Sequence, residues 1–143
     1  MIGWRRVELP TRTDERGSLT FVENGAEIPF DVRRVRWIHG APAAAKRGGH
    51  GHHRTVQLFV AVAGALTVSV DDGRARERVR LASPSEGLLI GPLVWIDTEE
   101  WSDGAVLLML GSEKHDPDDY IRDYRALVAA AARGRGSGRS ATT

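Results

Sequence analysis

The sequence predicts an all-β fold, a double-sheet jelly roll, followed by one C-terminal α-helix. The prediction rests on many short apolar or alternating segments at near-regular spacing, on the turn residues between them, and on a single helical pattern at the end of the chain. A length of 143 residues suits one hydrophobic core and is too short for two. We therefore expect a single domain over residues 1–132.

The expected strands all precede the expected helix. They are predicted at about residues 4–9, 18–23, 33–39, 55–62, 66–70, 76–81, 88–97 and 105–110. The clearest turn lies at Asp72-Gly73, because both residues tolerate the positive backbone angles of a tight hairpin. About eight strands with short connections favour two packed sheets.

The C-terminal helix is predicted to begin near Asp116, which can cap it, with Pro117 at the first helical position, and to end at about residue 132. One face carries apolar side chains at helical spacing and is expected to dock on an apolar surface; the face consists of Tyr120, Ile121, Tyr124, Leu127, Val128 and Ala131. Residues 133–143 are rich in Gly, Ser and Arg and are predicted to form a disordered tail without chemistry.

The composition excludes several classes of function. With 41% hydrophobic and 27% charged residues, the chain is typical of a folded globular protein. The near balance of 20 Lys+Arg against 19 Asp+Glu argues against nucleic acid as a partner. The lack of cysteine excludes disulfide scaffolds, thiolate nucleophiles, zinc fingers and iron–sulfur clusters.

No apolar stretch approaches the roughly 18 residues of a membrane span, and the N-terminus lacks a signal peptide's apolar core. We therefore expect no membrane partner and a cytoplasmic location.

Three of the five histidines lie together ahead of an apolar run, in the segment Arg47-Gly-Gly-His50-Gly-His52-His53. Residues two apart in a strand share a face, so His50 and His52 point to one side and His53 to the other. The simpler interpretation is a polar strand end with solvated histidines. We favour a functional pair, because a glycine-rich lead-in before a buried strand is typical of a site at the mouth of a barrel.

A metal site at these histidines would need a third ligand and usually a fourth. The next candidate is Gln57, a neutral amide where a carboxylate would be expected, and the later turn over residues 91–96 has no histidine. Chemistry without metal or cofactor is therefore favoured. A neutral imidazole can take a proton from carbon next to a ketone and return it elsewhere, which is worth roughly 10²- to 10⁴-fold in rate.

Arginines offer candidate phosphate contacts. Arg16 and Arg47 each precede a glycine near a strand start, and a guanidinium group binds diphosphate oxygens in pairs, although a lone Arg-Gly is usually only a turn. Arg36 and Trp37 lie in a charged strand that also suits a solvated edge, and both interpretations stay open. The chain has no Walker-type loop, no Gly-x-Gly-x-x-Gly turn and no serine nucleophile elbow.

An ordered series of motifs over most of the chain resembles the WxcM-like, FdtA-type cupins. The motifs are Asp14-x-Arg16-Gly17-x-Leu19, Ile28-Pro29-Phe30-x-x-Arg33-Arg34-Val35, Arg47-Gly48-x-His50-x-His52, Gln57, Gly64, Asp71-Asp72-Gly73, Pro84-x-x-Gly87-Leu88-x-Ile90-x-Pro92-x-x-Trp95 and Asp118-Asp119-Tyr120-Ile121-Arg122-Asp123-Tyr124. The resemblance implies a metal-free cupin jelly roll, a homodimer, that acts as a 3,4-ketoisomerase on dTDP-4-keto-6-deoxyglucose. Its product would supply aminotransferases that make amino-deoxysugars.

The resemblance also implies roles for the candidate residues. His50 and His52 would be the acid–base pair: one imidazole takes the proton from sugar carbon 3, an enediol forms, and a proton is delivered to carbon 4. Arg16 and Arg47 would lie near the sugar or diphosphate, and Gln57 would bond the sugar or a histidine. These donors would also stabilise the developing enolate charge.

The sequence departs from the family pattern around this pair. Family members carry tyrosines at the positions of Arg36, Trp37 and His115 and a histidine at the position of Ile96. Arg36, Trp37 and His115 are nevertheless expected to bind substrate. The departures leave two alternatives open: a cupin isomerase, epimerase or cyclase that acts on another biosynthetic intermediate, or a non-catalytic cupin that binds a small molecule. A metal-dependent oxygenase ranks third.

Overall fold

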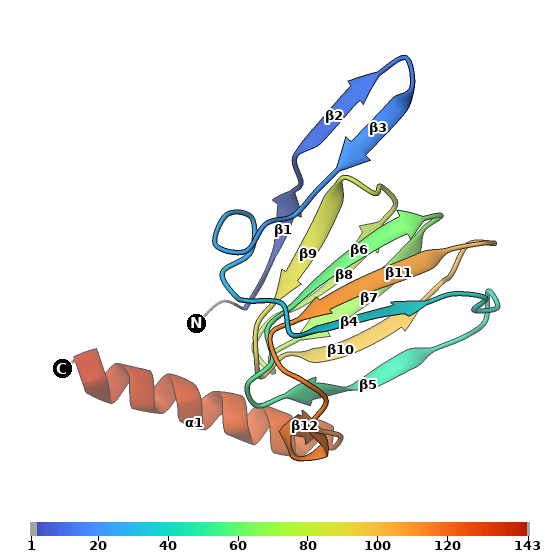
Figure 1. The fold of residues 1–143 in the computed structure, drawn as a ribbon. Helices are drawn as coiled ribbons and strands as arrows, with labels where there is room; N and C mark the ends of the chain where they lie inside the picture. Colours follow the sequence, from blue (N-terminus) through green and yellow to red (C-terminus); the bar gives the residue numbers. More distant parts are fainter. Residues whose placement is uncertain (1–2, 143) are drawn as a thin grey trace.

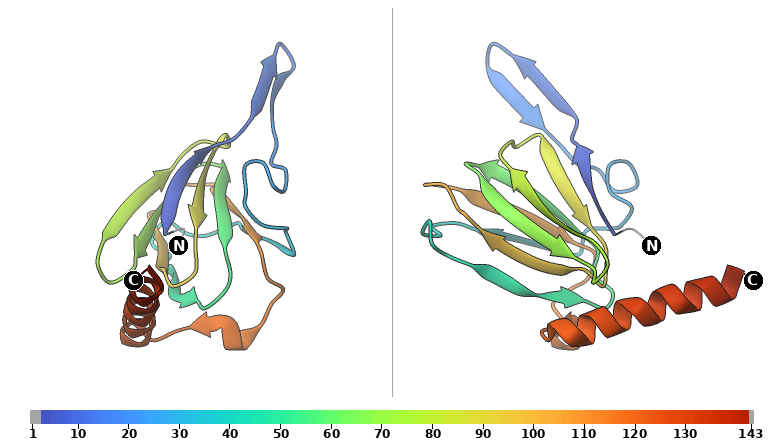
Figure 2. Two further views of the ribbon diagram at one scale, coloured as in Figure 1. Left: turned by 90° about the vertical axis from the view of Figure 1, so that its left-hand side faces the viewer. Right: turned by 180° about the vertical axis from the view of Figure 1, so that it is seen from behind.

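Two five-stranded antiparallel sheets pack face to face in the computed structural model, which describes residues 3–142 (Figure 1). The first sheet has the order β1-β9-β6-β11-β4 and the second β12-β5-β10-β7-β8, while β2 and β3 form a separate hairpin. The hairpin projects from one end of the molecule, and the C-terminal helix crosses the other (Figure 2). The predicted all-β fold with one C-terminal helix is confirmed.

The elements have the following bounds. The first sheet consists of β1 (Trp4–Glu8), β4 (Arg34–Ile38), β6 (Gln57–Ala63), β9 (Glu86–Ile90) and β11 (Val106–Gly111). The second consists of β5 (Arg47–His52), β7 (Leu66–Asp71), β8 (Arg76–Leu81), β10 (Trp95–Glu99) and β12 (Tyr120–Ile121). The remaining elements are β2 (Thr11–Asp14), β3 (Gly17–Thr20), the 3₁₀ helix η1 (Pro117–Asp119) and the helix α1 (Tyr124–Thr142).

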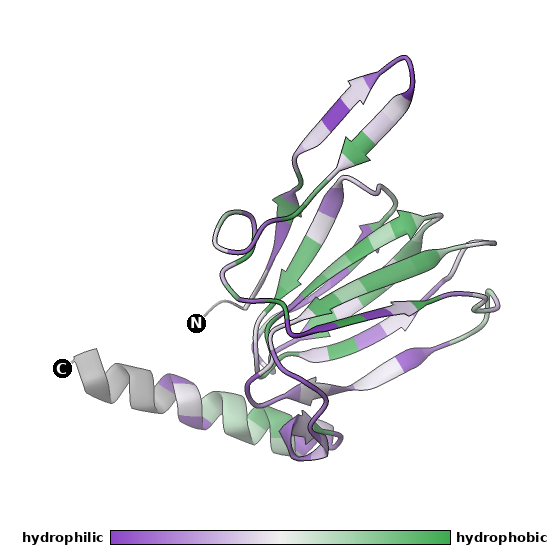
Figure 3. Cartoon of the chain, in the orientation of Figure 1, coloured by the Kyte–Doolittle hydropathy of each residue, from purple (hydrophilic) through white to green (hydrophobic). Residues whose placement is uncertain are grey.

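The main core lies between the two sheets. In β7 the fully buried Val68 and Val70 alternate with half-buried residues, as expected for a strand with one buried face. β6 differs, because Phe59 faces the second sheet while Leu58 packs beneath the N-terminal segment. A strand that is buried on both faces reads as an unbroken apolar run. Figure 3 shows the resulting concentration of hydrophobic residues on the central strands.

The observed strands differ from the predicted ones in one assignment and in strands that were missed. The single strand predicted over residues 88–97 is two strands in different sheets, β9 and β10. Pro92 has no backbone N–H to donate to a neighbouring strand, and Leu93 adopts a left-handed φ of 60°. The chain therefore turns between β9 and β10. β2 and β5 are absent from the predicted strands. All four residues of β2 are exposed and carry no apolar alternation, and β5 alternates glycine with histidine in place of apolar side chains.

The predicted helix start at Asp116 was wrong, because Asp116 caps a different element. Its carboxylate accepts the backbone N–H of Asp118 at 3.0 Å and opens η1. The chain then forms β12, which pairs with β5, and α1 begins only at Tyr124. Asp123 caps α1 by accepting the backbone N–H of Arg125 at 2.9 Å. Two aspartates able to cap a helix thus stand where the pattern indicated one start.

α1 docks through a narrow stripe in which Leu127 and Ala131 are buried. The helix extends to Thr142, past its predicted end at about residue 132, and no proline interrupts the segment. The domain boundary at residue 132 and the disordered tail over 133–143 stay predictions, and residue 143 and the side chains from 136 onward lie outside the described residues. No described helix is long and apolar enough to cross a membrane.

Gly51→Ala is expected to destabilise the protein by about 1–3 kcal/mol, because overpacking forces neighbouring atoms apart. A Cβ at position 51 would lie 2.5 Å from the Val94 carbonyl oxygen and would overlap the Leu127 side chain of α1. Gly111→Ala is the control, since the nearest atoms to its Cβ lie at 3.8 Å. Guanidinium unfolding measures both variants, and equal midpoints would contradict this account of how α1 packs on β5.

Candidate active site

β5 carries both predicted acid–base histidines on its inner face. His50 and His52 alternate with Gly49 and Gly51, and the Gly51 backbone faces α1. The two imidazole rings meet edge to face with their centroids 5.1 Å apart. His52 is buried with 4% of its surface exposed, His50 is half-buried, and His53 beyond the strand end is exposed. β5 therefore points His50 and His52 inward as a pair, while His53 lies outside.

A cavity of about 220 Å³ opens beside His50 between the two sheets. Its predicted members are Arg36 and Trp37 of β4, Arg47 and His50 of β5, and Gln57 of β6; Ile38, Gly48, Phe59, Ile96, Thr98 and Met109 complete the wall. Trp37 and Arg47 are exposed and so lie at the mouth. Arg36 and Gln57 also border a small inner space of about 10 Å³ that His52 lines.

The chain changes sheets between His52 and Gln57, which decides where Gln57 points. In one unbroken strand the odd spacing would aim the two side chains apart. Instead β5 ends at His52 and β6 begins at Gln57 in the opposite sheet, so both point into the barrel. Gln57 Nε2 lies 3.4 Å from His52 Nδ1, and Gln57 Oε1 accepts a hydrogen bond from Arg36 at 2.9 Å.

Tyr120 closes the inner end of the site and was missed as a functional residue. Its ring centroid lies 5.0 Å from that of His50 and 4.6 Å from that of His52, and its hydroxyl accepts a hydrogen bond from Arg34 at 3.2 Å. The sequence pattern placed Tyr120 on the apolar stripe of a helix. The missed signal is the second capping aspartate, Asp123, which leaves the preceding residues free to pair with β5.

Two predicted substrate contacts are not brought to the cavity of their own chain. Arg16 lies at the turn of the β2–β3 hairpin, far from the sheets' inner space, where it pairs with Asp14 at 2.6 Å and leaves 83% of its side chain exposed (Figure 1). His115 is exposed and packs on the outer side of Tyr120 with ring centroids 5.8 Å apart. Neither residue lines the cavity of its own chain, and a contact of either one with substrate stays a prediction.

Burial makes both histidines weak bases. It lowers the pKa of His52 from 6.5 to about 4, a shift that His50 increases and Asp119 opposes. Burial also lowers the pKa of His50, with Arg122 and Arg36 adding to the effect and the Gly48 carbonyl opposing it. Both imidazoles are therefore neutral at pH 7, and their titration is coupled because the rings are neighbours.

The arrangement suits proton transfer to and from a bound molecule. A neutral imidazole can accept a proton on one nitrogen and donate from the other. Arg36 is half-buried and makes no ion pair with any carboxylate in the described part of the chain, so its charge faces the cavity. Within residues 3–142 no three His, Cys, Asp or Glu side chains are grouped to hold a metal ion. The residues present therefore supply acid–base groups and anion-binding donors.

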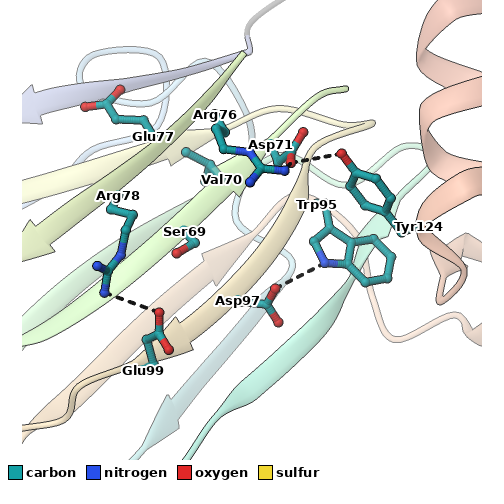
Figure 4. Close-up of a pocket in the computed structure, with 10 residues that line it drawn as sticks. All are labelled: Ser69, Val70, Asp71, Arg76, Glu77, Arg78, Trp95, Asp97, Glu99 and Tyr124. Atoms are coloured by element: carbon teal, nitrogen blue, oxygen red, sulfur yellow. Dashed lines mark hydrogen bonds and ion pairs between the residues drawn. The ribbon is translucent and has the colours of Figure 1, made fainter. Parts of the chain in front are cut away.

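A larger hollow of about 470 Å³ lies on the outer face of β7, β8 and β10, away from the histidines (Figure 4). Its polar groups bond to one another: Tyr124 and Arg76 to Asp71 at 2.9 and 3.0 Å, and Trp95 to Asp97 at 3.1 Å. The sequence assigned no function to these residues. Because these polar groups already bond to one another, the outer hollow offers a ligand fewer free hydrogen-bond donors than the inner cavity does.

Comparisons with known proteins agree with this geometry. A family model described as WxcM-like, C-terminal (FdtA) matches residues 3–132. TDP-4-oxo-6-deoxy-α-D-glucose-3,4-oxoisomerase from Aneurinibacillus thermoaerophilus is 38% identical over 111 residues, which are 78% of this chain and 80% of the relative. A mutant of the 3,4-ketoisomerase QdtA from Thermoanaerobacterium thermosaccharolyticum, solved with TDP-4-keto-6-deoxyglucose, has a TM-score of 0.89 at 32% identity and covers 93% of this chain and 96% of its own. WlaRB, a TDP-quinovose 3,4-ketoisomerase from Campylobacter jejuni, has a TM-score of 0.86 at 32% identity, covering 90% and 99%.

The free energy of unfolding is expected to fall as the pH is lowered from about 6.5 towards 4. In that window the unfolded chain takes up a proton at His52 while the folded chain does not, because burial lowers the folded pKa from 6.5 to about 4. The full shift corresponds to about 3 kcal/mol. Denaturant unfolding at several pH values measures it. His52→Asn should flatten the slope and His53→Asn should keep it; an unchanged slope in His52→Asn would contradict the assignment.

Proposed function

The chain belongs to the WxcM-like, C-terminal family, and from this we propose that it is a nucleotide-sugar 3,4-ketoisomerase. It moves the ketone of a dTDP-linked 4-keto-6-deoxyhexose from carbon 4 to carbon 3. Relatives named for this activity match the chain over most of its length. In the structure, the observation that carries the proposal is the buried, edge-to-face pair of His50 and His52 at a cavity with guanidinium groups in its wall.

His50 is the imidazole that lines the cavity, and in the proposal it takes the proton from sugar carbon 3. Protonation of the carbon 4 oxygen then gives an enediol. Loss of the proton on the carbon 3 oxygen and delivery of a proton to carbon 4 complete the shift, with no net gain or loss of protons. His52 lies beside His50 and Tyr120 and lines the small inner space that shares Arg36 and Gln57 with the cavity; in the proposal it is the second acid–base group and exchanges protons with the sugar oxygens.

Arg36, Arg47 and Trp37 are proposed to hold the substrate. Guanidinium groups bind diphosphate oxygens in pairs and stabilise enolate charge as it develops in a partly dry site. Arg36 faces the reacting end beside Gln57. Arg47 lies at the mouth with Trp37, a 60% exposed residue whose ring offers a flat apolar surface to a nucleotide base. We therefore propose that the sugar binds at the inner end and the nucleotide at the mouth. A cytoplasmic location stays a prediction.

Wild-type protein incubated with dTDP-4-keto-6-deoxyglucose in deuterated water is expected to place deuterium at carbon 4 and the carbonyl signal at carbon 3, as followed by NMR. Carbon 4 of the substrate bears no hydrogen, so label there requires the ketone to move. His50→Asn should reduce the rate by roughly 10²-fold or more, since a general base is lost. His53→Asn, exposed and adjacent, is the control. Label confined to carbon 3 or 5 with the ketone still at carbon 4 would identify an epimerase instead.

We also propose that the protein is a homodimer in which a second copy covers the outer face of the first sheet. An apolar groove of about 400 Å³ runs between the hairpin and this sheet; it is lined by Leu9, Ser18, Thr20, Phe21, Val22, Val60, Val62, Pro84, Leu108 and Leu110. Val62 is 42% exposed there, and Leu19 on the hairpin is 63% exposed. Large apolar patches of this kind mark association surfaces. The projecting hairpin would then carry Arg16 towards the partner's cavity.

Sedimentation is expected to show a dimer that Val62→Asp converts to monomers, because the new carboxylate would be buried without a partner. Ala129→Asp places the same charge on the exposed face of α1 and should leave the dimer intact. The Arg16 proposal has its own test: mixing Arg16→Ala chains with His50→Asn chains restores activity if Arg16 serves the partner's site. A monomeric wild type would overturn the dimer, and no restoration would overturn the role of Arg16.

A further inference from the structure

The amide of Gln57 bridges a cation and an imidazole. Arg36 donates to Gln57 Oε1 at 2.9 Å, and Gln57 Nε2 lies 3.4 Å from His52 Nδ1. The three residues come from β4, β6 and β5, so they connect the edge of the first sheet with the second sheet across the barrel. Gln57 is 2% exposed, which leaves water little access to compete for either end of the amide.

The chemistry of the cation fixes the direction of this bridge. A guanidinium group only donates hydrogen bonds, so the amide oxygen must face Arg36 and the amide NH₂ must face His52. Turning the amide over would set two buried donors against each other, at the penalty of unsatisfied polar groups. Gln57 therefore donates, His52 Nδ1 accepts, and the single proton of the neutral ring sits on Nε2.

The other groups around His52 do not compete for Nδ1. The charge of Asp119 acts on the His52 ring, but its carboxylate oxygens accept hydrogen bonds from the Arg54 backbone N–H at 2.7 Å and from the Thr55 hydroxyl. His50 and Tyr120 meet His52 through their ring faces and edges, and the hydroxyl of Tyr120 is bonded to Arg34. Gln57 is thus the only side chain bonded to His52 Nδ1 among the described residues.

We propose that Arg36 is a positioning residue that, through Gln57, holds His52 as the neutral tautomer with its proton on Nε2. His52 then presents an N–H donor to a sugar oxygen while His50 stays free to accept the carbon proton. The proposal rests on the proposed ketoisomerase function for its catalytic meaning, although the tautomer itself exists without substrate. It also gives Arg36 a task that is distinct from holding the diphosphate.

The tautomer is measured in ligand-free protein at pH 7 by two-bond ¹⁵N–¹H NMR of histidine-labelled samples, with exposed His53 as internal reference. Wild type should show a protonated Nε2 and an unprotonated Nδ1 at His52. Gln57→Glu, which replaces the donor by an acceptor that Arg36 can pair, should reverse the pattern. Arg36→Met should give a mixture, and Arg36→Lys, still only a donor, should restore the wild-type pattern. A protonated Nδ1 in wild type, or no change in Gln57→Glu and Arg36→Met, would overturn the proposal.

A kinetic test separates positioning from substrate binding. Arg36→Met is expected to lower kcat at least tenfold, whereas Arg36→Lys should recover most of kcat even if KM rises. A change confined to KM in both variants would mean that Arg36 only binds substrate. Absence of turnover in wild type would overturn the ketoisomerase assignment and leave the NMR result standing, so the two failures are distinguishable.

Discussion

A buried carboxylate holds the corner on which the whole site depends. Asp119 is 2% exposed and accepts hydrogen bonds from the Arg54 backbone at 2.7 Å and from the Thr55 hydroxyl, inside the segment that takes the chain from the second sheet to the first. Hydrogen bonds to a carboxylate are stronger than those between neutral groups. Because β5 ends and β6 begins at this corner, the same contacts bring His52 and Gln57 face to face.

Depth in the barrel decides what each histidine can do. His53 adjoins His52 in the chain but lies in solvent, whereas His52 lies among Tyr120, His50 and the floor of the barrel. Removal from water disfavours the charged ring and keeps it neutral. The cation of Arg36 nearby acts in the same direction on both inner histidines. A neutral imidazole is free to accept a proton, and a fixed positive charge beside it can stabilise the enolate charge that proton abstraction next to a ketone creates.

The edge position of β4 accommodates both interpretations of its arginines. β4 is the last strand of the first sheet, and its inward residues are Arg34, Arg36 and Ile38. Charges that point inward from an edge strand discourage pairing with another sheet. The same placement puts one guanidinium group on the Tyr120 hydroxyl and the other on the Gln57 amide. A single geometric arrangement thus protects the edge and supplies the cavity with donors.

The sequence by itself determined the all-β class, the C-terminal helix and the shared face of His50 and His52, because each follows from a local period of two or of 3.6 residues. Tertiary structure alone decided that Gln57 faces His52, that Tyr120 leaves the helix to close the site, and that Arg16 projects away from its own cavity. Those outcomes depend on which sheet a strand joins and where a turn is capped. Both depend on contacts between residues far apart in the chain, and local periodicity carries no information about such contacts.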